Sequence, residues 1–148
     1  MLPKLKDRGI WGLTFVHKLT GLAWLIGAGA ILWLAATALA SGEADYDLIS
    51  RLARIGSTAS VITMALGVAY HLFTVWGFAG SRVLWLKWAL YLVAVSASGY
   101  TIRAAREADA GLLVALAAVQ VVLLAAAMGS GVYLELGRKA GRLPRPRA

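Results

Sequence analysis

The sequence predicts an all-α, polytopic membrane bundle of four transmembrane spans, with both termini on the cytoplasmic side. Of its 148 residues, 60% are hydrophobic and 15% are charged, whereas a soluble domain is about half apolar and roughly a quarter charged. The apolar residues form long blocks, and three of them, 19–42, 55–81 and 110–134, contain no Asp, Glu, Lys or Arg. A fourth block, 83–102, is interrupted only by Lys87.

Each block is long enough to cross a bilayer, which takes about 20 apolar residues at about 1.5 Å each. We therefore expect a single membrane domain over residues 1–148 with spans at about 11–40, 57–78, 83–103 and 110–136. Too few residues remain for a soluble catalytic domain of about 50 residues. With no cysteine, the chain cannot hold a disulfide, a thiolate-bound iron–sulfur cluster or a covalently attached haem.

The connections follow from turn and charge signals. Ser41-Gly42 ends the first span, and the acidic loop 43–54 follows it, with an amphipathic second half that we expect in the membrane interface. A tight turn at 79–82 joins the second and third spans, and a nearly neutral loop at 103–109 joins the third and fourth. The basic tail 137–148 contains two prolines, so its last residues are not helical.

The net charge of +8 comes from basic residues that gather at three places along the chain. These are the N-terminal segment, the 79–82 turn and the C-terminal tail, with Lys4, Lys6, Arg8, Arg82, Arg138, Lys139, Arg142, Arg145 and Arg147. The positive-inside rule then predicts N-in, C-in topology and an even number of spans in the inner (cytoplasmic) membrane. Contact with acidic lipid or with an acidic soluble partner is a compatible interpretation, and this distribution argues against nucleic acid.

Two histidines, His17 and His71, lie inside predicted spans, where an ionisable group needs a partner or a function. His17 follows Arg8 by about 13 Å along a helix, and His71 precedes Arg82 by about 16 Å. Since the two spans are antiparallel, both imidazoles are expected at similar depth in the cytoplasmic half. Neutral imidazole is a common iron ligand, and a helix-packing histidine bonded to a hydroxyl or carbonyl is the alternative for each.

Other polar residues in the spans have simpler interpretations. Thr63, Gly67 and Thr74 share the helical face of His71 and would leave room there for a flat macrocycle. Lys18 and Lys87 are expected to extend to the membrane interface. A further three residues are expected to form inter-helix hydrogen bonds: Tyr91, Gln120 and Tyr133. Four tryptophans are expected in a cytoplasmic aromatic belt: Trp11, Trp76, Trp85 and Trp88.

The segment Thr14-Phe15-Val16-His17-Lys18-Leu19-Thr20-Gly21 resembles the S-x-x-H-R-x-[ST]-G signature of the cytochrome b membrane-anchor subunit of succinate dehydrogenase and fumarate reductase. His71 in Ala69-Tyr70-His71 matches the family's haem-ligating histidine on the second span. The resemblance covers about 70 residues. The chain departs from the family in Lys18, where an arginine is usual, in Trp76-Gly77-Phe78, where G-x-R-H is usual, and in its fourth span.

This resemblance implies a function in respiratory electron transport. It implies that His71 is an axial ligand of haem b, that His17 lies near the haem propionates and quinone, and that Thr14 and Lys18 bind the quinone. It also implies an iron–sulfur subunit, a flavoprotein subunit that carries the dicarboxylate chemistry, and a second membrane-anchor subunit that supplies the other haem ligand.

Two other functions are compatible with the same residues. One is a stand-alone b-type cytochrome in which His17 and His71 ligate one haem within this chain. The other is a membrane accessory protein without a cofactor. Transport is disfavoured because no acidic residue lies in the interior of a predicted span.

Overall fold

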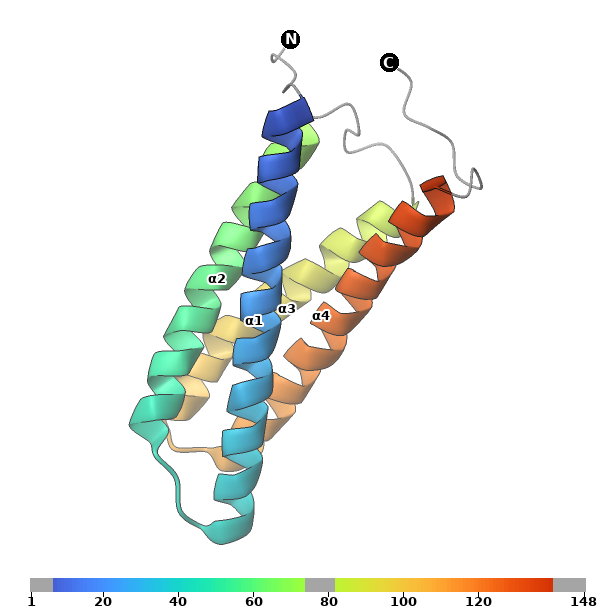
Figure 1. The fold of residues 1–148 in the computed structure, drawn as a ribbon. Coiled ribbons are helices and arrows are strands. Elements are labelled where there is room, and N and C mark those ends of the chain that lie inside the picture. Colours follow the sequence, from blue (N-terminus) through green and yellow to red (C-terminus); the bar gives the residue numbers. More distant parts are fainter. Residues whose placement is uncertain (1–6, 74–81, 140–148) are drawn as a thin grey trace.

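The computed structural model describes residues 7–73 and 82–139, which form four helices. These are α1 (Asp7–Ser41), α2 (Tyr46–Phe73), α3 (Arg82–Arg106) and α4 (Ala110–Lys139). Successive helices run in opposite directions (Figure 1). α1 packs against α2 and α4, and α3 packs against the same two helices, so the four form a closed ring.

Three of these helices are long and apolar enough to cross a membrane by length and composition. Within the described residues they are Trp11–Ser41, Tyr46–Phe73 and Ala110–Tyr133. The helix outside this set is α3, which carries Lys87, Arg103 and Arg106. The prediction of an all-α membrane bundle is thus confirmed for the helices and for membrane-compatible character.

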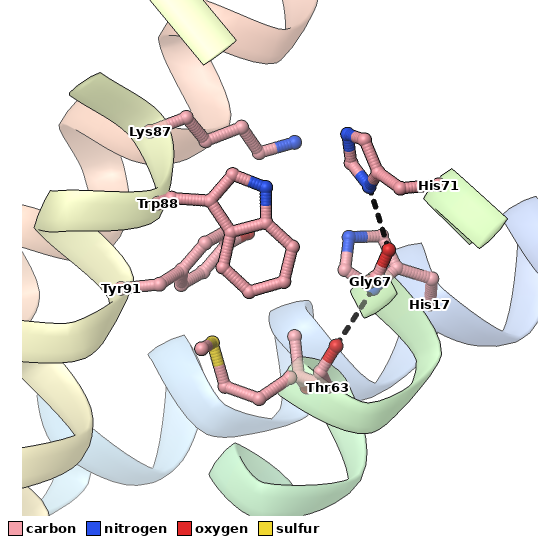
Figure 2. Close-up of a pocket in the computed structure, with 8 residues that line it drawn as sticks. His17, Thr63, Gly67, His71, Lys87, Trp88 and Tyr91 are labelled. Carbon is pink, nitrogen blue, oxygen red and sulfur yellow. Dashed lines mark hydrogen bonds between the residues drawn. The ribbon is translucent and has the colours of Figure 1, made fainter. Parts of the chain in front are cut away.

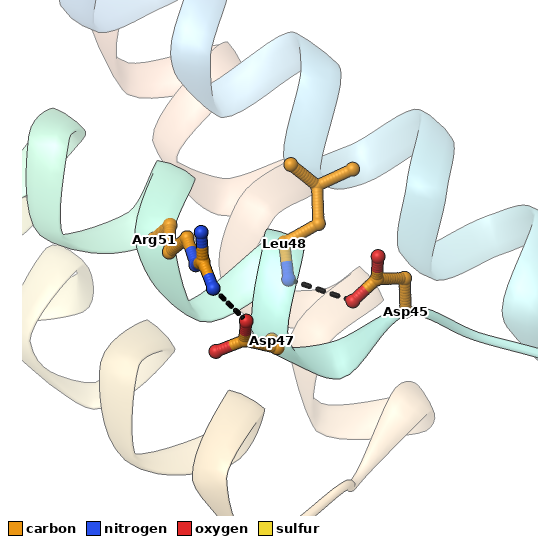
Figure 3. A network of polar contacts seen from close by, with 4 residues as sticks. All are labelled: Asp45, Asp47, Leu48 and Arg51. Carbon is orange, nitrogen blue, oxygen red and sulfur yellow. Dashed lines mark hydrogen bonds and ion pairs between the residues drawn. The ribbon is translucent and has the colours of Figure 1, made fainter.

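The second helix begins at Tyr46, well before the predicted start near residue 57. Asp45 caps it, because its Oδ1 accepts the Leu48 backbone N–H at 2.8 Å (Figure 3), as N-terminal aspartates commonly do. One turn further on, Asp47 pairs with Arg51. The segment predicted to lie in the interface is therefore the first part of α2.

The other described helix ends follow their sequence signals. Gly42, predicted with Ser41 to end the first helix, has φ +76° and donates its N–H to the Ala38 carbonyl at 2.9 Å. Asp109 caps α4 by accepting the Leu112 N–H at 2.9 Å. The N-terminal lysines, Thr74, Trp76 and most of the 79–82 turn lie outside the described residues, as does the C-terminal tail from residue 140.

The core is divided along the bundle. The half that contains the α1–α2 and α3–α4 connections has a small-residue cluster: Ile31, Ala35, Ile49, Ala53, Ala104, Ala105, Leu113 and Ala117. A second cluster lies nearer the end where α1 begins and α4 ends: Trp24, Ala28, Tyr91, Ala94, Leu124 and Ala127. Alanines allow close helix packing where lipid supplies little hydrophobic driving force.

The bundle opens toward the end where α1 begins and α4 ends. In Figure 1 the α1–α2 pair and the α3–α4 pair converge near the two short connections and diverge toward the opposite end. Of the predicted basic positions, Arg8, Arg82, Arg138 and Lys139 are on the described helices, and all four lie at that diverging end.

Candidate functional site

One cavity of the described bundle brings together both histidines of the chain. Its walls come from α1, α2 and α3: His17, Thr63, Met64, Gly67, His71, Lys87, Trp88 and Tyr91 (Figure 2). The cavity measures about 20 Å³, enough for one water molecule, and the open space that includes its mouth measures about 250 Å³. The expectation that the two histidines lie at similar depth is confirmed.

Helix α2 orients both imidazoles through its backbone. His17 Nδ1 lies 3.1 Å from the Thr63 carbonyl oxygen, and His71 Nδ1 lies 2.7 Å from the Gly67 carbonyl oxygen. A carbonyl only accepts, so each Nδ1 carries the hydrogen and donates it. In a neutral ring the lone pair is then on Nε2, where it can accept a hydrogen bond or a proton.

Gly67 brings the three helices close together at this point. A Cβ on Gly67 would lie 3.5 Å from His17 Cε1 and 3.5 Å from Trp88 Cη2. Gly21 plays a similar part on α1, where a Cβ would lie 3.8 Å from Thr63 Cγ2. At both positions a methyl group would make ordinary van der Waals contacts, so the glycines mark where the helices pack closely.

The third wall comes from α3, which sequence reasoning did not assign to the site. Lys87 directs its ammonium toward the cavity (Figure 2), and its Nζ lies 5.7 Å from the centre of the Tyr91 ring. The Trp88 ring is 5.6 Å from that of His71, edge to face. Trp88 therefore belongs to the bundle interior rather than to the aromatic belt, whereas Trp11 and Trp85 are exposed.

The signal that could have identified this wall is the charge of Lys87 within an apolar block. An ionisable residue in a membrane segment usually faces the bundle interior and marks a functional position. The sequence predicts that Lys87 extends to the membrane interface, whereas in the structure its side chain lines the cavity.

The remaining predicted quinone residues lie outside the cavity. Thr14 is half-buried on α1, and Lys18 is exposed. Thr14 precedes His17 by three residues, and Lys18 follows it directly. Neither residue lines the cavity. The structure thus brings together His17 and His71 from the predicted site and separates them from Thr14 and Lys18.

The ring nitrogens of the two histidines are suited to bind a haem iron, but the space between the rings is too small for a haem. Both rings present Nε2, the nitrogen that binds iron when Nδ1 donates to a carbonyl. The cavity beside them holds about one water, and Trp88 packs against His71 and close to Gly67. A haem between His17 and His71 would require Trp88 to leave. A haem shared with another chain would require His71 to turn away from α3.

Among the described residues, no group of three or more His, Cys, Asp or Glu side chains could hold a metal ion. The polar residues deeper in the bundle are paired with one another. Gln120 accepts from Trp24 Nε1 at 3.3 Å and from Ser98 Oγ at 2.8 Å, and it donates to Thr101 Oγ1 at 2.7 Å. The prediction that Gln120 bonds between helices is confirmed, whereas Tyr133 is 63% exposed.

Comparison of the chain with family models, with curated proteins and with solved structures gave no match. The resemblance carried by the 14–21 segment therefore remains a prediction from those residues. The functional argument has to come from the cavity itself.

Proposed function

We propose that the chain is a membrane-anchor subunit of the cytochrome b type, in a succinate:quinone oxidoreductase or fumarate reductase, and that its cavity receives the quinone headgroup. The observation that carries this proposal is the convergence of His17, His71 and Lys87 on one cavity. Ionisable groups are costly inside a bilayer, so three that share a cavity indicate a polar ligand. The 14–21 resemblance supplies the class of complex.

The space and chemistry of the cavity suit a quinone. The enclosed space of about 20 Å³ admits one carbonyl oxygen in place of the water, so the quinone ring would lie in the open mouth of the cavity. Reduction of a quinone to a quinol takes two electrons and two protons. The electrons would come from the partner iron–sulfur subunit, and neutral imidazoles with lone pairs on Nε2 are suited to exchange the protons.

The other two predicted site residues, Thr14 and Lys18, lie on the same helix as His17 but do not line the cavity. Their contact with the quinone stays a prediction of the resemblance, and this proposal assigns them no part in holding the headgroup. Haem b with His71 as a ligand also stays a prediction of the resemblance. The described packing does not accommodate it, so no step of this proposal uses a haem.

The diverging end of the bundle is the proposed cytoplasmic face of the inner membrane. The basic residues near it would attract an acidic iron–sulfur subunit and acidic lipid headgroups. A quinone in the cavity would then lie close to the docked subunit. The flavoprotein subunit would perform the dicarboxylate chemistry, and a second membrane anchor would complete the complex.

The function is tested by purifying the tagged chain from native membranes in mild detergent. We expect iron–sulfur and flavoprotein subunits to co-purify and succinate to reduce added quinone. The proposal is contradicted if the chain purifies without these subunits and the preparation has no succinate:quinone activity. A b-type optical band that disappears in His71→Ala, without such activity, would favour the stand-alone cytochrome instead.

We also propose that α3 crosses the membrane as a fourth span, with N-in, C-in topology. The connections before α2 and α4 would then lie on the same, outer side. The native chain has no cysteine, so single cysteines can be placed at two exposed acidic positions, Glu43→Cys and Glu107→Cys. A membrane-impermeant maleimide added outside should label both. Labelling at 43 but not at 107 would leave α3 on the inner side and give three spans.

A further inference from the structure

Lys87 is the cation that lines the cavity, and among the side chains that the structure describes no carboxylate forms an ion pair with it. Its described contact is with the ring of Tyr91. Among the side chains that the structure describes, the two ion pairs are Arg51 with Asp47 and Arg103 with Glu107. Both pairs lie at the opposite end of the bundle, near the two short connections. An ammonium in an apolar bundle without an anion needs an electron-rich ligand atom.

The fourth helix leaves space for this side chain. A Cβ on Gly131 of α4 would lie 3.4 Å from Lys87 Nζ, so the glycine lets the ammonium lie between α3 and α4 while it lines the cavity. The ammonium thus lies close to α4 while it lines the cavity between α2 and α3.

The combination of groups discriminates between possible ligands. The ammonium of Lys87 can only donate hydrogen bonds, whereas the Nε2 of neutral His17 accepts one. A phosphate or another small anion would gain from the lysine but meet the lone pair of the imidazole. A quinone carbonyl accepts from an ammonium, and the hydroxyl of the reduced quinol donates to an imidazole. The cavity is suited to an oxygen that changes from acceptor to donor.

We propose that Lys87 donates the hydrogen bond that holds the quinone carbonyl oxygen, with Trp88 and Met64 as apolar walls for the ring. This inference rests on the proposed quinone function and deepens it. The headgroup is assigned to the interior between α2 and α3, whereas the resemblance implies the surface of α1 around Thr14 and Lys18. Lys87 lies outside the part of the chain that the resemblance covers.

The test is calorimetric titration of a short-tail ubiquinone, and separately a short-tail naphthoquinone, into the full chain in lipid nanodiscs. Titration into empty nanodiscs corrects for partition into lipid. Lys87→Met keeps the length of the side chain and removes the donor. Because a hydrogen bond to a charged group is lost, we expect Kd for the preferred quinone to rise about tenfold or more. Lys18→Met should change Kd less than about twofold, as exposed charges contribute little.

Two further measurements separate a direct contact from a structural role. Gly131→Val should displace the ammonium without changing its charge, and we expect Kd to rise several-fold while circular dichroism stays unchanged. The corresponding quinol should lose less affinity than the quinone in Lys87→Met, since its hydroxyl can use His17. Equal losses for quinone and quinol would indicate a structural effect and overturn the assignment.

The outcomes distinguish this inference from the function on which it rests. If Lys18→Met weakens binding and Lys87→Met does not, the quinone function stands and the headgroup lies on α1. If the unaltered chain binds neither quinone in nanodiscs and its native complex does not reduce one, both proposals fail. Should Lys87→Met fail to fold, Gly131→Val gives the decisive comparison.

Discussion

Two sets of polar residues, one in each half of the bundle, differ in how they are paired. In the half near the short connections, Gln120, Ser98 and Thr101 are buried and bond to one another or to backbone carbonyls. In the diverging half, His17 and Lys87 are only partly buried and face a cavity. Both sets interrupt apolar helices, yet only the second leaves chemical groups available to a ligand. The state of pairing, more than polarity itself, distinguishes a structural position from a functional one.

The backbone follows the same division. Near the connections, alanines such as Ala35, Ala104 and Ala117 are almost fully buried, and the helices converge (Figure 1). In the diverging half the space between helices is filled by aromatic rings, including Trp88 and Tyr91. Tight small-residue packing fixes one half, which lets the other half hold a partly open cavity.

The largest effect should come from the diverging half. His17→Ala removes an imidazole suited to exchange protons with the quinone, and general acid–base groups contribute about a hundredfold or more to a rate. We expect succinate:quinone activity of the native complex to fall by about that factor. Succinate oxidation by a soluble dye that takes electrons from the flavoprotein should be unchanged. Loss of both activities would place His17 in assembly of the complex instead.

In the half with paired polar residues, we expect a substitution to lower the stability of the protein and to leave its activity unchanged. Gln120→Leu is similar in size but leaves the buried Trp24 indole N–H without its acceptor, which costs about 1–3 kcal/mol. We expect earlier unfolding in a denaturing-detergent titration, with quinone affinity within about twofold of the unaltered chain. Val119→Leu, at the exposed neighbouring position, serves as the control and should change neither. A strong loss of quinone affinity in Gln120→Leu would mean that the two halves are coupled.

The smallest effects are expected at the start of α2. Asp45→Ala removes the acceptor for the Leu48 N–H and should destabilise the protein by about 1 kcal/mol. The adjacent Asp47→Ala breaks an ion pair whose side chains are 72% and 70% exposed, which is worth about 0.3–0.5 kcal/mol. Unfolding titrations of both variants should show this order. A larger effect of Asp47 would indicate that the pair contacts another chain.

Sequence patterns predicted the helix ends that depend on a single residue, as at Gly42, where a positive φ favours glycine. They did not predict the start of α2, because residues 46–55 carry three charged side chains among the apolar ones and lack the continuous apolar run of a span. That part is helical since Asp45 caps it and since Ile49 and Ala53 are buried in the small-residue cluster.

The candidate site likewise has one part that the sequence predicts and one part that it does not. Distance along each helix was enough to predict that His17 and His71 lie at similar depth. The rotation of α3 about its axis depends on its neighbours, so the inward position of Trp88 could not be read from its own segment, whereas the charge of Lys87 within an apolar block was an available signal. The depth of a residue follows from its position along the helix. The side of the helix that faces the interior is set only when the helices pack together.

The attachment of both imidazoles to α2 has a consequence for motion. His17 belongs to α1, yet it bonds to the carbonyl of Thr63, and His71 bonds to the carbonyl of Gly67. These carbonyls are four residues apart, which is about 6 Å of helical rise. Helix α2 alone therefore sets the spacing of the two rings. A displacement of the α3–α4 pair relative to the α1–α2 pair would therefore leave the distance between the two imidazole rings unchanged.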